Sequence, residues 1–134
     1  MSRHRYQLNV RFSDVDLYRH VNNVKYFEYY QEARLALLGS LGRLDDAVSS
    51  GFTTVVARIR VEYKRPILFR PEPYVVETWV MRVGTSSYTL GSEIKDGDTV
   101  LSAAEVVAVR FDRSRQRPSP LTDEDRTLLL TVAE

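Results

Sequence analysis

Ten residues near the start of the chain combine groups that can act on a carbonyl. The segment Asp14-Val-Asp-Leu-Tyr-Arg-His-Val-Asn-Asn23 holds two carboxylates, one imidazole and two carboxamides. An ionised carboxylate can attack a polarised carbonyl directly, or it can activate a water molecule as a general base. We therefore predict Asp16 as the attacking or activating group, with His20 as a further catalytic candidate.

This segment leads into a stretch with helical periodicity, from about Asn22 to Leu38. Four residues recur at the spacing of one helical face: Tyr26, Tyr30, Ala33 and Leu37. Asn22 is the predicted N-cap, and Gly39 is predicted to end the helix. The first turn of a helix leaves backbone N–H groups unpaired, and such groups can stabilise a developing oxyanion. We predict the amide at about Asn23 as that donor.

The rest of the chain has the patterns of strands, turns and short helices. Alternating or continuous apolar positions predict strands over 5–13, 53–63, 74–83, 87–95 and 99–111. Asp96-Gly97 predicts a hairpin, and Thr122 with Asp125 predicts a capped helix in the tail 122–133. A short irregular helix is expected over 40–50, ended by Gly51. The pattern predicts a single α+β domain, 1–134, in which one antiparallel sheet wraps one long helix.

Composition excludes several classes of protein. The chain has 134 residues, no cysteine, and a net charge of +1, so disulfide scaffolds, thiolate sites and bulk nucleic-acid binding are not expected. No apolar run approaches the length of a membrane span, and we expect a cytoplasmic protein without a membrane partner. The sequence contains no G-x-S-x-G, G-x-G-x-x-G or Walker loop.

Two other interpretations of the acidic segment stay open on the residues alone. Asp, Asn and Ser crowd turns and helix caps for purely structural reasons, so the segment could be a capping loop. Asp14, Asp16 and His20 could also bind a metal, although no fourth ligand is evident. We predict no metal site and no cofactor.

The chain resembles the hot-dog-fold acyl-CoA thioesterases of the 4-hydroxybenzoyl-CoA thioesterase-like family. The resemblance rests on Asp14-Val-Asp16, on His20-Val-Asn-Asn23 and on the Tyr-rich helix that ends in Glu32-Ala-Arg34. Weaker matches are Tyr63-Lys-Arg-Pro66, Gly84-Thr-Ser-Ser87 and Ala103-Ala104. The resemblance implies a five-stranded sheet in the order 1-3-4-5-2 around a central helix, and a homodimer or a dimer of dimers (a homotetramer).

The same resemblance implies roles for individual residues. It makes Asp16 the catalytic carboxylate and places the helix-start amide of Asn23 against the thioester oxygen, in a cleft between two protomers. It also suggests a set of substrate-binding residues: Arg19, Tyr26, Arg65, Ser87 and Arg117. One departure is Arg19, which replaces a family glycine, and we expect the loop to take a different path there or to keep a negative φ.

The resulting prediction is a hydrolase that cleaves an acyl thioester of coenzyme A, or of an acyl carrier protein, to the free acid and thiol. Two alternatives are a hot-dog enoyl-thioester hydratase or dehydratase, with Asp16 and His20 as its acid–base pair, and a non-catalytic acyl-thioester binding protein. The choice of acyl group stays open.

Overall fold

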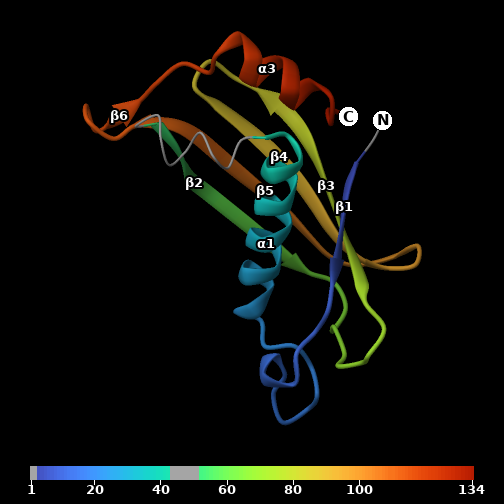
Figure 1. The fold of residues 1–134 in the computed structure, drawn as a ribbon. Coiled ribbons are helices and arrows are strands. Elements are labelled where there is room, and N and C mark those ends of the chain that lie inside the picture. The colour runs from blue at the N-terminus through green and yellow to red at the C-terminus, as the bar shows by residue number, and fades with distance from the viewer. Residues whose placement is uncertain (1–2, 43–51) are drawn as a thin grey trace.

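A single antiparallel sheet and one long helix make up most of the molecule. The computed structural model describes residues 3–42 and 52–134, and α1 lies across one face of the sheet (Figure 1). The strand order is β1-β3-β4-β5-β2, which confirms the implied order, and the two-residue β6 pairs with β5 as an addition to the five expected strands. The elements are β1 (His4–Leu8), a 3₁₀ turn (Phe12–Asp14), α1 (Lys25–Ser40), β2 (Phe52–Tyr63), β3 (Tyr74–Val83), β4 (Ser87–Asp96), β5 (Thr99–Asp112), β6 (Arg117–Pro118) and α3 (Asp123–Leu130).

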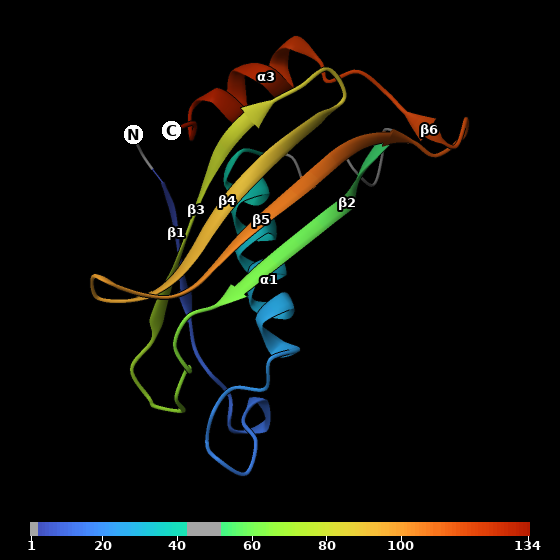
Figure 2. The same ribbon diagram turned by 180° about the vertical axis from the view of Figure 1, so that it is seen from behind.

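The core lies between α1 and the sheet. The helix buries one face, made of Tyr26, Tyr29, Tyr30, Ala33 and Leu37, against inward-facing side chains of β3, β4 and β5. Four of these five are the residues whose spacing predicts the buried face. α3 covers the end of the sheet beside β3, where the amide of Val80 donates to the carbonyl of Val132 at 2.9 Å (Figure 2).

The prediction of a strand over 5–13 is wrong beyond Leu8, where β1 ends. The amide of Asp14 donates to the carbonyl of Arg11 at 2.9 Å, and the Asp14 carboxylate accepts from the Arg11 amide at 3.1 Å. These two bonds coil residues Phe12–Asp14 into a 3₁₀ turn. A short polar side chain has therefore captured backbone groups that a strand would need.

The predicted helix boundaries are also wrong by a few residues. Asn22 does not cap α1, because its side-chain oxygen accepts from the Val24 amide at 3.0 Å in the turn before the helix. Gly39 lies within the last turn of α1, and the chain leaves the helix through Gly42 at φ +73°. Most of the irregular helix predicted over 40–50, together with Gly51, lies outside the described residues.

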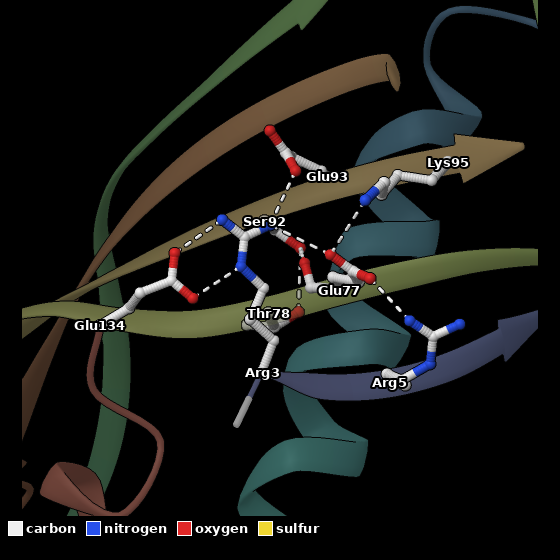
Figure 3. A network of polar contacts seen from close by, with 8 residues as sticks. All are labelled: Arg3, Arg5, Glu77, Thr78, Ser92, Glu93, Lys95 and Glu134. Atoms are coloured by element: carbon white, nitrogen blue, oxygen red, sulfur yellow. Dashed lines mark hydrogen bonds and ion pairs between the residues drawn. The ribbon is translucent and has the colours of Figure 1, made fainter. Parts of the chain in front are cut away.

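The face of the sheet opposite α1 carries a network of charges that ties both ends of the chain together (Figure 3). The Arg3 guanidinium donates to Glu134 at 2.7 and 2.8 Å, to Glu93 at 2.8 Å and to Glu77 at 3.0 Å. It also lies 3.7 Å above the ring of Trp79. That ring covers Gly91 so closely that an added Cβ would lie 2.6 Å from it.

The strand β2 forms one edge of the sheet. Eleven of its twelve residues pair with β5, with Ala57 at a bulge, and no described strand pairs with its other side. Val55 and Val56 are 37% and 44% exposed in the single subunit. A long edge with exposed apolar side chains is a template for pairing with another strand. No helix within residues 3–42 and 52–134 is long and apolar enough to cross a membrane.

Candidate active site

Asp14 anchors the segment that sequence analysis singled out. Its side chain is fully buried and accepts a hydrogen bond from the Tyr29 hydroxyl of α1 at 2.7 Å. Burial opposes ionisation, but hydrogen bonds from Tyr29 and Arg11 outweigh it and hold the pKa of Asp14 below its usual value. The Asp14 carbonyl also accepts from the Asn22 amide at 2.9 Å. Asp14 is therefore a structural residue that ties the loop to the helix.

The next residues form a tight hairpin that presents Asp16. Val15 and Val21 pair across it, and the Asp16 amide donates to the His20 carbonyl at 2.9 Å. The Arg19 amide donates back to the Asp16 carbonyl at 3.0 Å, which closes a turn over the three residues between Asp16 and His20. A hairpin loop of three residues needs its last residue in the left-handed region.

Arg19 occupies that left-handed position, at φ +62°. The expectation of a different path or a negative φ is therefore wrong: the loop keeps the conformation that suits glycine although the residue is arginine. A side chain in this region costs on the order of 1–2 kcal/mol, because its Cβ approaches the backbone. The hydrogen bonds of the hairpin hold Arg19 in place against that cost.

The turn fixes the carboxylate of Asp16 while leaving it open to solvent. One oxygen, Oδ1, accepts from the Tyr18 amide at 2.9 Å and from the His20 amide at 3.3 Å. The residue as a whole is exposed. Two backbone donors therefore orient the carboxylate, and its second oxygen has no hydrogen-bond partner among the described residues. Such a group is positioned to meet a reactant.

The start of α1 lies at the end of the same hairpin. Asn23 follows the stem residue Asn22 directly, it is exposed, and its amide donates no hydrogen bond among the described residues. Its carbonyl accepts from the Tyr63 hydroxyl at 2.9 Å. The ring of Tyr63 packs edge-on against Tyr26 at 4.7 Å between centroids. The strand β2 thus binds the peptide group that directly follows the predicted oxyanion donor.

Tyr63 was not among the residues predicted for the site. Its position gave one signal, since it continues the inward-facing alternation of Ile59 and Val61 on the strand predicted over 53–63. Its hydroxyl contact with Asn23 joins residues 40 positions apart, and local periodicity carries no information on such a contact.

His20 meets Asp16 through its backbone and not through its ring. Its amide supplies one of the two donors to the Asp16 carboxylate. The backbone of His20 also pairs with that of Leu68, in the loop between β2 and β3. The imidazole lies near the ring of Tyr18, with 6.4 Å between the ring centroids. No hydrogen bond joins the imidazole to the Asp16 carboxylate among the described residues, so this geometry does not favour the acid–base pair of the hydratase alternative.

The loop between β2 and β3 supports the hairpin from the side. The Val21 amide donates to the Ile67 carbonyl at 2.8 Å, and the Phe69 amide donates to the Arg19 carbonyl at 3.4 Å. Arg65 lies on this loop with an exposed side chain, and its amide donates to the Leu101 carbonyl at 3.0 Å. Arg65 is therefore at the Asp16 end of the molecule.

Of the predicted binding residues, Tyr26 is closed to solvent, and Ser87 and Arg117 lie far from Asp16. Tyr26 is buried in the core, where burial raises its pKa. Ser87 pairs with Val109 and Arg117 with Asp112 on β5, whereas Tyr63, at the site end, pairs with Ser102. On β5, the partners of Ser87 and Arg117 are seven and ten residues beyond Ser102, the partner of Tyr63. At about 3.3 Å per residue, Ser87 and Arg117 therefore lie roughly 23 and 33 Å from the Tyr63 end of the sheet.

The metal interpretation of the segment finds no support in this geometry. Asp14 is buried under Tyr29, whereas the carboxylate of Asp16 faces solvent. Across residues 3–42 and 52–134, no group of three or more His, Asp or Glu side chains could hold a metal ion.

The fold agrees with what the comparison with known families finds. A sequence model of the thioesterase-like superfamily matches residues 10–129. The chain therefore belongs to this superfamily, its fold is the hot-dog fold, and it is an enzyme of the thioester-hydrolase class.

Individual proteins are also similar to this chain in sequence or in structure. The uncharacterized protein YsmA of Bacillus subtilis is 32% identical over 127 residues, which are 92% of this chain and 83% of that protein. The long-chain acyl-CoA thioesterase FadM of Escherichia coli is 35% identical over 60 residues, 45% of this chain and 46% of that protein. A Thermus thermophilus thioesterase solved with coenzyme A and Zn superposes with a TM-score of 0.80 at 28% identity, covering 96% of this chain and 92% of that one.

Proposed function

We propose that the protein hydrolyses an acyl thioester of coenzyme A to the free acid and thiol, with Asp16 as the attacking or activating group. The observation that carries this proposal is the Asp16 carboxylate itself. It is oriented by two backbone amides, it is exposed, and it lies on the hairpin that leads into the start of α1. A carboxylate on the loop that leads to an unpaired amide supplies two of the groups that acyl transfer needs.

In the proposed reaction the thioester carbonyl lies between the Asp16 carboxylate and the Asn23 amide. The amide N–H hydrogen-bonds the carbonyl oxygen and stabilises the negative charge that develops during attack. Asp16 either attacks the carbonyl carbon or takes a proton from a water molecule that does so. The C–S bond then breaks and the sulfur leaves as a thiolate, which takes up the proton that Asp16 removed from water or, when Asp16 is the nucleophile, a proton from solvent. With Asp16 as nucleophile, water afterwards cleaves the acyl-enzyme anhydride and regenerates the carboxylate.

Coenzyme A is the carrier that the relatives favour. FadM is named as an acyl-CoA thioesterase, and the Thermus thermophilus protein was solved with coenzyme A. Arg65 is an exposed guanidinium at the Asp16 end, of the type that binds phosphate. An acyl carrier protein presents the same thioester on the same pantetheine arm, so it remains the alternative carrier.

We further propose that two copies associate through β2 to complete the site. Antiparallel pairing of β2 with its copy places the Tyr63 end of one strand beside the Phe52 end of the other. Because Phe52 pairs with Asp112 of β5, this arrangement brings Ser87 and Arg117 of the second copy toward Asp16 of the first. The large separation of these residues within one subunit then has an explanation. A dimer of dimers stays open.

The test is release of free thiol from acyl-CoAs with short, medium, long and aromatic acyl groups, measured with a thiol reagent. We expect at least one of them to be hydrolysed well above background. An enoyl-CoA that loses its conjugated absorbance without releasing thiol would instead indicate hydration. Saturable binding without turnover of any substrate would indicate a binding protein and contradict the proposal.

A further inference from the structure

Arg19 combines a backbone conformation that suits glycine with a cationic side chain that has no partner in the described part of the chain. Its φ of +62° closes the turn that holds Asp16. The guanidinium is exposed, and among the described residues it makes neither a hydrogen bond nor an ion pair, although Arg3, Arg11 and Arg70 all have carboxylate partners. A non-glycine residue held at positive φ points to a function for its side chain.

The turn limits what that side chain can reach. The Arg19 amide is bonded to the Asp16 carbonyl, so the two residues move as one unit. If Asp16 meets the thioester carbonyl, as the proposed function requires, Arg19 lies on the same turn as the reacting carboxylate, and its long side chain can reach groups of the acyl chain near that carbonyl. The phosphates of coenzyme A lie at the far end of the pantetheine arm from the thioester, beyond the reach of this side chain. An anion that Arg19 binds is therefore on the acyl group.

We propose that Arg19 selects acyl groups that carry a carboxylate close to the thioester, such as the half-thioesters of short dicarboxylic acids. A guanidinium binds a carboxylate through two parallel N–H···O bonds, which gives geometric selectivity as well as affinity. The positive charge of Arg19 also offsets the repulsion between a substrate carboxylate and the nearby Asp16. This inference rests on the proposed function and adds a substrate class to it.

The test compares two substrates of nearly the same shape, glutaryl-CoA and 5-methylhexanoyl-CoA. Glutaryl-CoA ends in a carboxylate, whereas 5-methylhexanoyl-CoA ends in an isopropyl group. The measured quantity is the ratio of their kcat/KM values. For the natural chain we expect this ratio to favour glutaryl-CoA by about tenfold or more, as a charge-assisted hydrogen-bonded pair gives. In Arg19→Gln the ratio should fall about tenfold, and in Arg19→Lys it should be partly kept.

Arg5→Gln is the matched control, because it removes one positive charge at an exposed site on β1, the edge of the sheet opposite β2. It should leave the ratio as it is in the natural chain. A natural ratio near one, or a ratio that Arg19→Gln does not change, would overturn the inference.

A second pair of substrates separates the acyl group from the carrier. Glutaryl and 5-methylhexanoyl thioesters of N-acetylcysteamine keep the thioester but have no phosphate. We expect the same preference and the same loss in Arg19→Gln with this pair. Arg19→Gln could instead lower kcat/KM equally for both acyl groups on coenzyme A and leave the N-acetylcysteamine thioesters unchanged. That result would show that Arg19 binds the phosphates of coenzyme A, and it would overturn the inference. If no thioester of either kind releases thiol, the proposed function itself fails.

Discussion

The hydrogen bond from the Tyr29 hydroxyl to Asp14 joins the loop that carries Asp16 to α1. In Tyr29→Phe the Asp14 carboxylate keeps only Arg11, whose side chain is 66% exposed, and the distant Lys25 ammonium at 4.0 Å. A hydrogen bond to a charged group contributes about 1.5–3 kcal/mol, so we expect the free energy of unfolding to fall by about 2 kcal/mol.

The corresponding change in melting temperature follows from the size of the chain. Unfolding entropy of about 2.1 cal/mol/K per residue gives about 0.28 kcal/mol/K for 134 residues, so a loss of 2 kcal/mol lowers Tm by about 7 °C. Calorimetry or circular dichroism at pH 7 measures this shift. Tyr30→Phe is the matched control, because its hydroxyl donates to the neutral Ser102 Oγ at 2.6 Å, and it should cost only about 1 kcal/mol.

The loss in Tyr29→Phe should also depend on pH. The pKa of Asp14 is lower in the folded protein than in the unfolded chain, so its charge stabilises the fold above its unfolded pKa, and this contribution disappears as pH falls through the folded pKa. The difference between the natural chain and Tyr29→Phe should therefore shrink in acid, whereas the Tyr30→Phe difference should not. Equal losses in the two variants, or a Tyr29→Phe loss that does not change with pH, would refute the assignment of Asp14 as a charged anchor.

Two other predictions concern the surroundings of Asp16. Tyr63→Phe removes the donor that holds the Asn23 carbonyl, and we expect kcat to fall about tenfold. The change in Tm should be only a few degrees, because Tyr63 is 47% exposed. An unchanged kcat would show that this contact does not position the site. Val56→Lys places a charge on the exposed edge β2; light scattering should show a weaker dimer, and thiol release should fall together with it and recover at higher enzyme concentration. A fully active monomer would contradict a site shared between copies.

Local patterns predicted the parts of the fold whose signals lie within a few residues. The strand 74–83 agrees residue for residue with β3, Gly97 takes φ +57° in the hairpin after Asp96, and Thr122 with Asp125 forms the capping box of α3. The predicted ends of helices and strands were wrong where a side chain hydrogen-bonds a backbone group in place of another backbone group. Asn22 bonds the Val24 amide and delays the helix, and the contacts between Arg11 and Asp14 end the first strand early.

The chemistry of the site was less accessible from sequence, because contacts distant in the chain decide it. The sequence singled out Asp16 as the reactive carboxylate, but it did not show which group holds Asp14. Only the contact of Asp14 with Tyr29, 15 positions later, makes one carboxylate structural and leaves the other exposed. The positive φ of Arg19 was also missed, because the hairpin that imposes it depends on the pairing of Val15 with Val21. The positions of Ser87 and Arg117 relative to Asp16 depend on pairing between strands that are distant in the sequence.

The central claim is that the Asp16 carboxylate drives cleavage of the thioester. Asp16→Asn keeps an oxygen that can accept from the Tyr18 and His20 amides, so the hairpin should persist while the charge is lost. Asp98→Asn, at the exposed β4–β5 turn, is the matched control. On the best acyl-CoA of the panel, we expect kcat for thiol release to fall by about 10²-fold or more in Asp16→Asn and to stay within about twofold in Asp98→Asn. A folded Asp16→Asn variant that releases thiol as fast as Asp98→Asn would contradict the claim.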